Sequence, residues 1–433
     1  GDTALTNDNG TLKWNGTEVG SSGTTFNGGT VTNATTFNST LTVTGASTMN
    51  GALTVAGTLT ASGDAYVTGD LYVDDGTLLI NYITNTVNNV TSTVTADSDK
   101  NTYAGTNALS SLTSGTANVA FGYDALKSTT SGVNNTGLGA YALLSNTTGS
   151  YNIAIGEGAL KKNTSASNNT AIGARTLYSN TTGGCNIAVG YKSLYSNTIG
   201  EYNNAQGVYA LQTNTTGSSN SALGQSALRY NTTGSYGTAV GADALKSNTT
   251  GSNNTAVGAK SLFSNTTASN NTAIGFRSMY SNTTGSSNNA IGSYAMYENT
   301  TGSYNSAVGQ SALRENTTGA SNTAVGESAL TKNTTASNNT AIGARALYVN
   351  TTGASNTAVG ASVLRSNTTG AYNTGLGASA LYANTSGDNN AAFGYYALKN
   401  NTTGSNNLAL GYQAGYGNET GSGNVFLGYQ AGY

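Results

Sequence analysis

A repeat of 17 residues limits what this chain can fold into more than any other feature of its sequence. The segment SNTTGSNNTAVGAKSLF (247–263) is followed directly by a near-copy, SNTTASNNTAIGFRSMY (264–280). One glycine recurs every 17 residues from Gly105 to Gly428 without insertion or deletion, which gives 20 copies over 101–433. A fixed period of this length is typical of solenoids, in which each copy is one structural unit stacked on the next.

Comparison of the copies shows which positions the architecture constrains. We number one copy from 1 to 17, with Asn254 at position 1 and Asn270 at position 17. Position 5 is always Gly, position 1 is nearly always Asn, and positions 12 and 15 are mostly Asn and Gly. Position 3 is usually Ala, position 4 is Val, Ile, Leu or Phe except at Ala104 and Gln206, and position 9 is Leu or Met as far as Gly415.

A copy of this length has no room for a pair of stable helices. Two segments, positions 1–4 and 6–11, are bounded by turn residues and predict two short strands. Stacked copies would form parallel ladders about 4.8 Å apart, so that 20 rungs would extend roughly 90–95 Å. The predicted fold class is therefore all-β, an elongated and fibrous β-solenoid or β-roll.

Three positions are predicted to serve the fold. The invariant glycine indicates a corner with positive φ or a close backbone approach. The asparagines at positions 1 and 12 are expected either to bond to the same residues in the rungs above and below or to form turns. The glycines of this prediction include Gly258, Gly275, Gly292, Gly309 and Gly326, and the asparagines include Asn254, Asn271, Asn288, Asn305 and Asn322.

Each rung is expected to be apolar on two faces. Positions 3 and 4 are both apolar, as in Ala256–Val257, and positions 8 and 9 repeat the pattern, as in Ala244–Leu245. Neighbouring residues of a strand point to opposite faces, so one face would line the coil and the other would need a partner. We therefore expect close packing of several chains, as in a homotrimer.

The first hundred residues differ from the repeat body. The segment 10–20 predicts a small hairpin around Trp14, and short stretches of alternating Thr and apolar residues over 39–73 predict a slender β-shaft. In 80–94, Ile80, Ile83, Val87, Val90 and Val94 are spaced 3, 4, 3 and 4, as in a coiled-coil seam of three or more strands. An irregular or strand-like connector is the open alternative. The expected domains are a shaft over 1–75, a connector over 76–100 with a short trimeric coiled coil as one option, and the repeat body over 101–433.

The composition argues against disorder and against most enzyme chemistry. Only 8% of the residues are charged, yet the chain has 27 Tyr, which is unlike disordered segments. There is no His, and the single Cys185 can form neither an intrachain disulfide nor a zinc cluster. Carboxylates are scattered and are expected to be solvated rather than a catalytic pair; they include Asp74, Asp75, Asp97, Asp99, Glu157 and Glu327. We predict no enzyme activity, no cofactor and no metal site.

Two columns of side chains are candidate contact sites for a ligand. Position 10 holds Tyr, Arg and Lys in most copies, and position 17 holds Tyr in several. Tyrosine offers a flat apolar face and a hydroxyl, which suit sugar rings and protein surfaces; a solubilising surface is the alternative. The first column includes Tyr178, Tyr195, Arg229, Tyr280, Tyr297, Arg314, Tyr348, Arg365 and Tyr382, and the second includes Tyr151, Tyr202, Tyr236, Tyr304 and Tyr372.

The repeats resemble two families of fibrous proteins. The segments 339–364 (NTAIGARALYVNTTGASNTAVGASVL) and 421–433 (GSGNVFLGYQAGY) are similar to repeats of bacteriophage tail fibres, and 41–64 is similar to their shafts. The N-x-A-[VI]-G core also resembles the head repeats of trimeric autotransporter adhesins, whose repeat is shorter. The resemblance implies a trimeric fibre, and it implies a C-terminal chaperone domain that cuts itself off after the last repeat.

These observations together predict a structural and receptor-binding fibre. We expect a phage tail fibre on the virion, extracellular, which attaches to a host surface glycan or protein and joins other tail or fibre proteins through its N-terminus. A bacterial cell-surface adhesin or an extracellular filament is the alternative. The net charge of −2 and the lack of a long apolar run predict neither nucleic-acid binding nor membrane insertion.

Overall fold

The described structure is built from short β-strands alone. The computed structural model describes residues 94–433 and, within residues 1–93, the backbone of strands β1–β14. The chain divides into two compact units, Gly1–Thr84 and Asn85–Tyr433. All regular elements among these residues are strands, and none of the described segments forms a helix long and apolar enough to cross a membrane. The prediction of an all-β solenoid is confirmed.

The first unit is a three-sided coil of strands. Strands β1, β2 and β3 form an antiparallel meander that contains the predicted hairpin around Trp14. The following strands form three parallel ladders, β4–β7–β10, β5–β8–β11 and β6–β9–β12. The strands are β1 (Ala4–Asp8), β2 (Thr11–Trp14), β3 (Thr17–Glu18), β4 (Thr24–Phe26), β5 (Gly29–Val31), β6 (Thr35–Phe37), β7 (Leu41–Val43), β8 (Ser47–Met49), β9 (Leu53–Val55), β10 (Leu59–Ala61), β11 (Ala65–Val67) and β12 (Leu71–Val73).

A second repeat, which the sequence prediction missed, explains this coil. Thr30 pairs with Thr48, and Thr48 pairs with Tyr66, so one turn of the coil takes 18 residues. Six consecutive hexapeptides begin at residues 41, 47, 53, 59, 65 and 71, where β7 to β12 begin. Hexapeptide repeats are a signature of parallel β-helices, and three hexapeptides make one turn.

The connector contains strands where a coiled coil was one option. Strands β13 (Asn85–Val87) and β14 (Val90–Ser92) pair antiparallel, with Val87 opposite Val90. The described part of 76–100 is thus strand and turn rather than helix. Its Thr and Asn residues are weak helix formers, whereas β-branched Val and Thr favour strands. The remaining seam residues, Ile80 and Ile83, lie outside the described residues.

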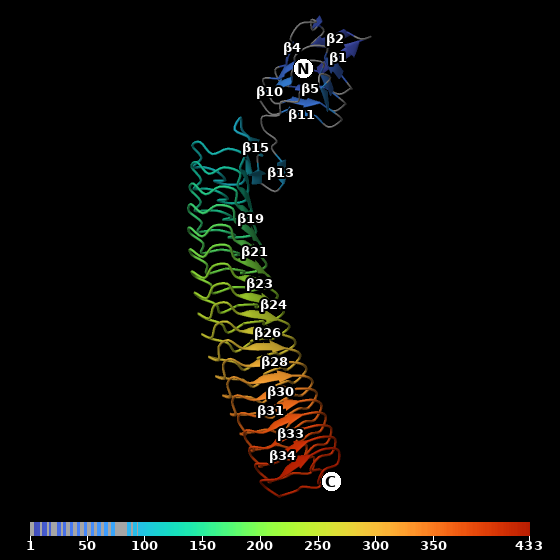
Figure 1. Cartoon of the computed structure of the whole chain (residues 1–433). Coiled ribbons are helices and arrows are strands. Elements are labelled where there is room, and N and C mark those ends of the chain that lie inside the picture. The colour runs from blue at the N-terminus through green and yellow to red at the C-terminus, as the bar shows by residue number, and fades with distance from the viewer. Residues whose placement is uncertain are drawn as a thin grey trace. The chain divides into compact units, whose positions relative to one another are not determined.

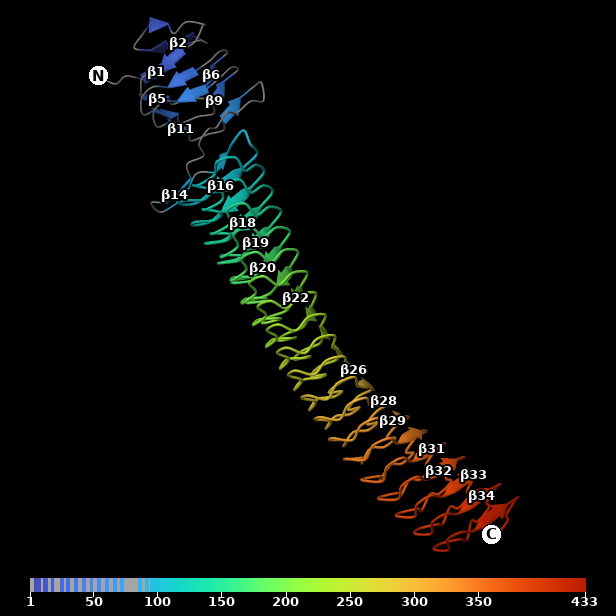
Figure 2. The ribbon, with the colours of Figure 1, turned by 60° about the vertical axis from the view of Figure 1, so that its left-hand side comes forward.

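The second unit is a stack of 20 parallel strands, one for each copy of the repeat. Figures 1 and 2 show these strands one above another along the length of the unit. Each strand covers positions 2–4 of its copy, and every pair is in register with an offset of 17, as in Ala256 opposite Ala273. The strands are β16 (Thr102–Ala104), β17 (Val119–Phe121), β18 (Thr136–Leu138), β19 (Ile153–Ile155), β20 (Thr170–Ile172), β21 (Ile187–Val189), β22 (Asn204–Gln206), β23 (Ser221–Leu223), β24 (Thr238–Val240), β25 (Thr255–Val257), β26 (Thr272–Ile274), β27 (Asn289–Ile291), β28 (Ser306–Val308), β29 (Thr323–Val325), β30 (Thr340–Ile342), β31 (Thr357–Val359), β32 (Thr374–Leu376), β33 (Ala391–Phe393), β34 (Leu408–Leu410) and β35 (Val425–Leu427).

The predicted second strand, over positions 6–11, does not form. Positions 7 and 9 instead adopt a left-handed backbone, as in Lys260 (φ 56°) and Leu262 (φ 51°). This reversal at alternate residues turns both position 8 and position 9 inward, so Ser261 and Leu262 are both buried. The expectation that positions 8 and 9 face opposite ways is therefore wrong. The left-handed backbone costs roughly 1–2 kcal/mol for each non-glycine residue, and burial of one Leu side chain offsets it by about 1.5–3 kcal/mol.

The asparagines form both kinds of contact that the sequence left open, ladders between rungs and side-chain hydrogen bonds to the backbone of turns. At position 1, the backbone N–H of Asn271 donates to Asn254 Oδ1 (3.0 Å), while Asn254 Nδ2 donates to the carbonyl of position 15 at Ala268 (2.8 Å). At position 12, Asn265 Nδ2 donates to Asn248 Oδ1 (2.8 Å) and to the Ala268 carbonyl (3.0 Å). The position 12 ladder continues without a break from Asn146 to Asn418.

The glycine at position 5 is required by both conformation and space. Gly258 has φ +126°, and a Cβ added there would lie 2.6 Å from the carbonyl oxygen of Gly275 in the next rung. The other predicted glycines, Gly275, Gly292, Gly309 and Gly326, have φ between 130° and 134°. L-residues rarely adopt this backbone conformation, so each rung turns its corner at a glycine.

The first rung of the stack is closed by a short hairpin. Strand β15 (Thr95–Ala96) pairs antiparallel with β16 and covers the edge of the sheet. Asp97 Oδ1 accepts the backbone N–H of Asn101 (2.8 Å), which is the bond that an asparagine of a preceding rung makes elsewhere. Asp97 thus substitutes for the missing first member of the position 1 ladder.

The interior changes at the other end of the stack. In the last copy Phe426 replaces the small residue of position 3, and Gly415 and Gly432 replace Leu at position 9 in the last two copies. A Cβ on Gly415 would lie 2.6 Å from the Phe426 ring, and one on Gly432 would also overlap it. The ring therefore fills the volume that the leucines occupy in the preceding rungs.

Candidate binding surfaces

Members of the predicted Tyr and Arg column at position 10 contact one another over short runs of neighbouring rungs. The rings of Tyr178 and Tyr195 stack with centroids 5.2 Å apart, and Tyr280 and Tyr297 stack at 5.3 Å. The Arg365 guanidinium lies 5.8 Å from the Tyr348 ring and 5.6 Å from the Tyr382 ring, and it donates to the Tyr382 hydroxyl (2.7 Å). All nine predicted side chains of this column are half-buried.

Residues of positions 6 and 7, which the sequence prediction missed, add to these contacts. Arg229 lies over the ring of Tyr209 at position 7 (4.6 Å), and Arg314 lies over Tyr294 (5.9 Å). Position 7 was expected to lie in a strand, but its left-handed backbone places it beside position 10 of the same edge. The rings that have such a stacking or cation–π partner are covered on that face by a neighbouring rung.

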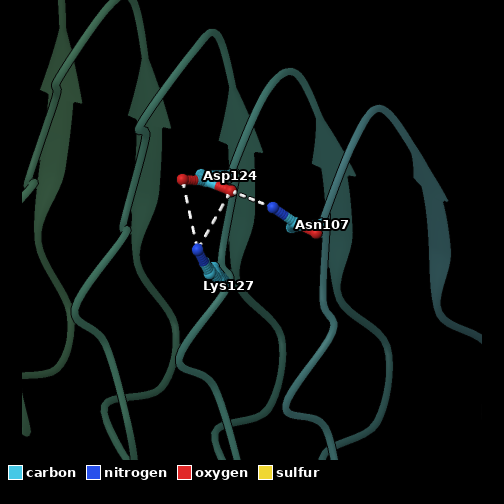
Figure 3. Close-up of polar contacts among 3 residues, drawn as sticks. All are labelled: Asn107, Asp124 and Lys127. Atoms are coloured by element: carbon cyan, nitrogen blue, oxygen red, sulfur yellow. Dashed lines mark hydrogen bonds and ion pairs between the residues drawn. The ribbon is translucent and has the colours of Figure 1, made fainter.

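The side of the stack that carries positions 7 and 10 also holds a small polar cluster near its first rungs. Asp124 at position 7 is buried and accepts a hydrogen bond from Asn107 Nδ2 (2.8 Å), while Lys127 at position 10 pairs with it at 3.3 Å (Figure 3). Asp243 and Lys246 repeat the pair between positions 7 and 10 at 2.9 Å. These two pairs balance the charges of Lys127 and Lys246.

The tyrosines of position 17 are arranged differently. Tyr151, Tyr202, Tyr236, Tyr304 and Tyr372 are 59–70% exposed. They lie two to four rungs apart, and among the described residues none of them makes an aromatic or cation–π pair. Most of each of these side chains is thus open to a flat ligand, which makes position 17 the better candidate of the two predicted columns for ligand contact.

The outer sheet face is an apolar surface that runs along the stack. We use this name for the side chains at positions 2 and 4 of β16–β35, which point away from the buried alanines of position 3. Position 2 is Thr in ten of the 20 copies, and position 4 is almost entirely Val, Ile, Leu or Phe. Ile291 is 42% exposed and Leu223 is 51% exposed. The predicted second apolar face exists at position 4 and is open to solvent in the single chain.

Among the described residues, the candidate carboxylates do not gather into one cluster. Glu157 pairs with Arg175 (3.2 Å). Asp97 accepts hydrogen bonds from Asp99 N–H and from Asn101, and Asp74 and Asp75 lie outside the described residues. Over 94–433, no group of three or more Cys, Asp or Glu side chains could hold a metal ion. Cys185 lies exposed at position 17.

Comparison of the chain with protein-family models, with curated proteins and with solved structures finds no match.

Proposed function

We propose that the chain is a structural and receptor-binding fibre, a phage tail fibre that attaches the virion to a host cell surface as a homotrimer. The observation that carries this proposal is the uninterrupted stack of 20 rungs joined by asparagine ladders. At about 4.8 Å per rung it extends roughly 90 Å, and such a stack suits a spacer that holds a contact surface at a distance. The attribution to phage tails rests on the resemblance of 339–364 and 421–433 to their repeats.

The outer sheet face supports self-association. If each side chain of position 4 offers on the order of 50 Å², the 20 rungs offer about 1,000 Å², above the roughly 800 Å² per partner of a standard interface. Monomeric proteins rarely expose contiguous apolar patches larger than a few hundred Å². A second and a third copy of the chain would cover this surface along its whole length.

The free tyrosines of position 17 support receptor contact. Each ring would contribute a weak contact with a sugar ring or a protein surface. Five such rings on each of three chains would act together through multivalency, which raises the overall affinity without any strong single site.

Binding to cells tests this proposal. Labelled protein is incubated with intact bacteria from a panel of strains, before and after periodate oxidation of surface glycans or protease treatment. We expect saturable binding to some strains, and replacement of all five position 17 tyrosines by Ser should lower it at least tenfold. Ser is a matched replacement because Ser219 and Ser287 occupy position 17 with the same left-handed backbone. Equal binding by the Ser variant would remove position 17 from the receptor site, and absence of binding to every strain would contradict the attachment function.

A further inference from the structure

The regularity of the outer sheet face raises a problem of register for any assembly of this chain. Rungs follow one another about every 4.8 Å, and 18 of the 20 present Val, Ile, Leu or Phe at position 4, while position 2 is Thr in ten of them. Two copies packed through this face could slide by one rung and keep almost all of their apolar contacts. Shape and hydrophobicity alone therefore cannot fix how the copies align.

One rung departs from the pattern. In β22 the two outward residues are Asn204 and Gln206, and Gln206 is the only polar residue at position 4 in β16–β35. It lies between Val189 and Leu223 of the neighbouring strands. Gln206 is exposed, while Ala205 between the two amides is buried.

The two amides are only partly satisfied within the chain. Gln206 Nε2 donates to Asn204 Oδ1 (3.1 Å). Among the described residues, Gln206 Oε1, the second N–H of its amide and the Asn204 amide nitrogen have no hydrogen-bond partner. An amide group offers two donors and an acceptor with two lone pairs, so each copy has both donors and acceptors left for another copy.

We propose that Asn204 and Gln206 set the register of a parallel, side-by-side assembly of copies of this chain. This inference rests on the self-association in the proposed function. With the copies in register, the Gln206 amides of all chains meet at one level and bond to one another. A slip of one rung sets each Gln206 against the Val189 or Leu223 of a neighbour and leaves its amide unpaired in an apolar contact. Single polar residues in an apolar seam fix the register of coiled coils in the same way.

The position of the polar rung also favours parallel copies over antiparallel ones. Strand β22 is the seventh of the 20 stacked strands. In an antiparallel pair, matching Gln206 with Gln206 would leave β29–β35 outside the contact and their apolar column uncovered. Only a parallel arrangement in register covers the whole column and also pairs the amides.

Cysteine cross-linking tests the register directly. All chains carry Cys185→Ser; one chain carries Ile274→Cys and a second, differently tagged chain carries Val308→Cys. Both sites lie at position 4 and are two rungs apart, about 10 Å along the stack, which is beyond disulfide reach. Copies in register therefore give homo-cross-links at Ile274→Cys and at Val308→Cys. A slip of one rung displaces each site from its counterpart by about 4.8 Å and weakens these homo-cross-links, whereas a slip of two rungs gives cross-links between the two different chains.

The variant N204T/Q206V restores the common repeat and should fold normally. We expect mixed cross-links to be at least tenfold rarer than homo-cross-links in the parent chain and to rise to within about threefold of them in the variant. Asn289→Thr, which changes a position 2 asparagine in a rung without a polar position 4, serves as the control and should leave the ratio unchanged. T238N/V240Q added to N204T/Q206V moves the polar rung to β24 and should restore a single register.

Sedimentation of the same samples separates the two proposals. An oligomer whose mixed cross-links are equally frequent with and without Asn204 and Gln206 would overturn the register inference and leave self-association standing. A monomer of 43.4 kDa would overturn both.

Discussion

At the scale of the residue, the repeat is fixed by the few positions where the backbone or a buried amide permits little choice. Gly at position 5 has φ between 116° and 141° in every rung. The side chain of Asn at position 12 is buried and forms hydrogen bonds with the rung before, the rung after and its own turn. Position 15 is less strict, because Ala166, Ala268 and Ala336 occupy it.

The two glycines of a single rung should therefore respond differently to Ala. At Gly292 the φ of +134° and a contact of 2.5 Å between the added Cβ and the Gly309 carbonyl oxygen should cost roughly 3 kcal/mol or more in unfolding free energy. At Gly302 an added Cβ would also lie close to a backbone carbonyl oxygen, that of Gly319, but Gly302 does not have a positive φ and Ala occupies this position in other rungs, so the cost should stay below about 1.5 kcal/mol. Denaturant unfolding of both variants checks this. Equal losses would mean that position 5 is not the strained corner described above.

Asparagines separated by five residues provide a second comparison. Asn265→Ser removes the donor to Asn248 and the acceptor for Asn282, so buried amide groups lose their partners at roughly 1–3 kcal/mol each. Asn270→Ser changes an exposed position 17 residue and should alter the unfolding free energy by less than about 0.5 kcal/mol. Thermal unfolding with hydrogen exchange of the neighbouring rungs measures both. A neutral Asn265→Ser would show that the ladder does not stabilise the stack.

At the scale of the element, the sequence predicted the strand of each rung but not the path of the rest. The 17-residue period, the glycine corner and the pairing of positions 2–4 follow from the copies themselves. Positions 6–11 were misjudged because a buried Leu in a left-handed backbone, such as Leu262, contradicts the local preferences on which strand prediction depends. The hexapeptide period of 41–73 was present in the sequence but was masked by the stronger 17-residue repeat.

The same local error explains what could and could not be predicted about the candidate surfaces. The second apolar face at position 4 followed from simple alternation. The contribution of positions 6 and 7 to the aromatic contacts of position 10 could not be predicted in this way. Simple alternation assumes an extended strand, and the contact between Tyr209 and Arg229 depends on the left-handed backbone at position 7. Which tyrosine column is free and which is stacked depends on rung-to-rung packing, and the sequence does not show this directly.

The cap of the first rung should be sensitive to acid. Partial burial raises the pKa of Asp97, but hydrogen bonds from the Asn101 backbone and side chain and from Asp99 N–H outweigh it and lower the pKa below 3.8. A carboxyl group whose pKa is lower in the folded state stabilises the fold above its unfolded pKa, and this contribution disappears as the pH falls through the folded pKa. Hydrogen exchange in 97–120 should therefore lose protection, relative to the central rungs, as the pH falls below 3.8.

Asp97→Asn is the matched control for this prediction. It keeps an oxygen that can accept the Asn101 N–H but does not titrate, so the protection of the first rung should no longer depend on pH in this range. If the parent chain and Asp97→Asn respond equally to acid, Asp97 is not the group that closes the ladder.

At the scale of the whole molecule, the account depends on the outer sheet face. Ile274→Lys, Ile291→Lys and Val308→Lys together place three charges on adjacent rungs of the apolar column, and buried like charges are strongly unfavourable. We expect this variant to remain folded but to dissociate. Thr267→Lys, Thr284→Lys and Thr301→Lys add the same charge at exposed positions of neighbouring rungs and should leave the assembly intact.

Sedimentation of the purified chain, with and without prior heating, tests self-association most directly. We predict an elongated, heat-resistant species with a mass near three times 43.4 kDa. A folded monomer of 43.4 kDa with the outer sheet face open to solvent would contradict the account.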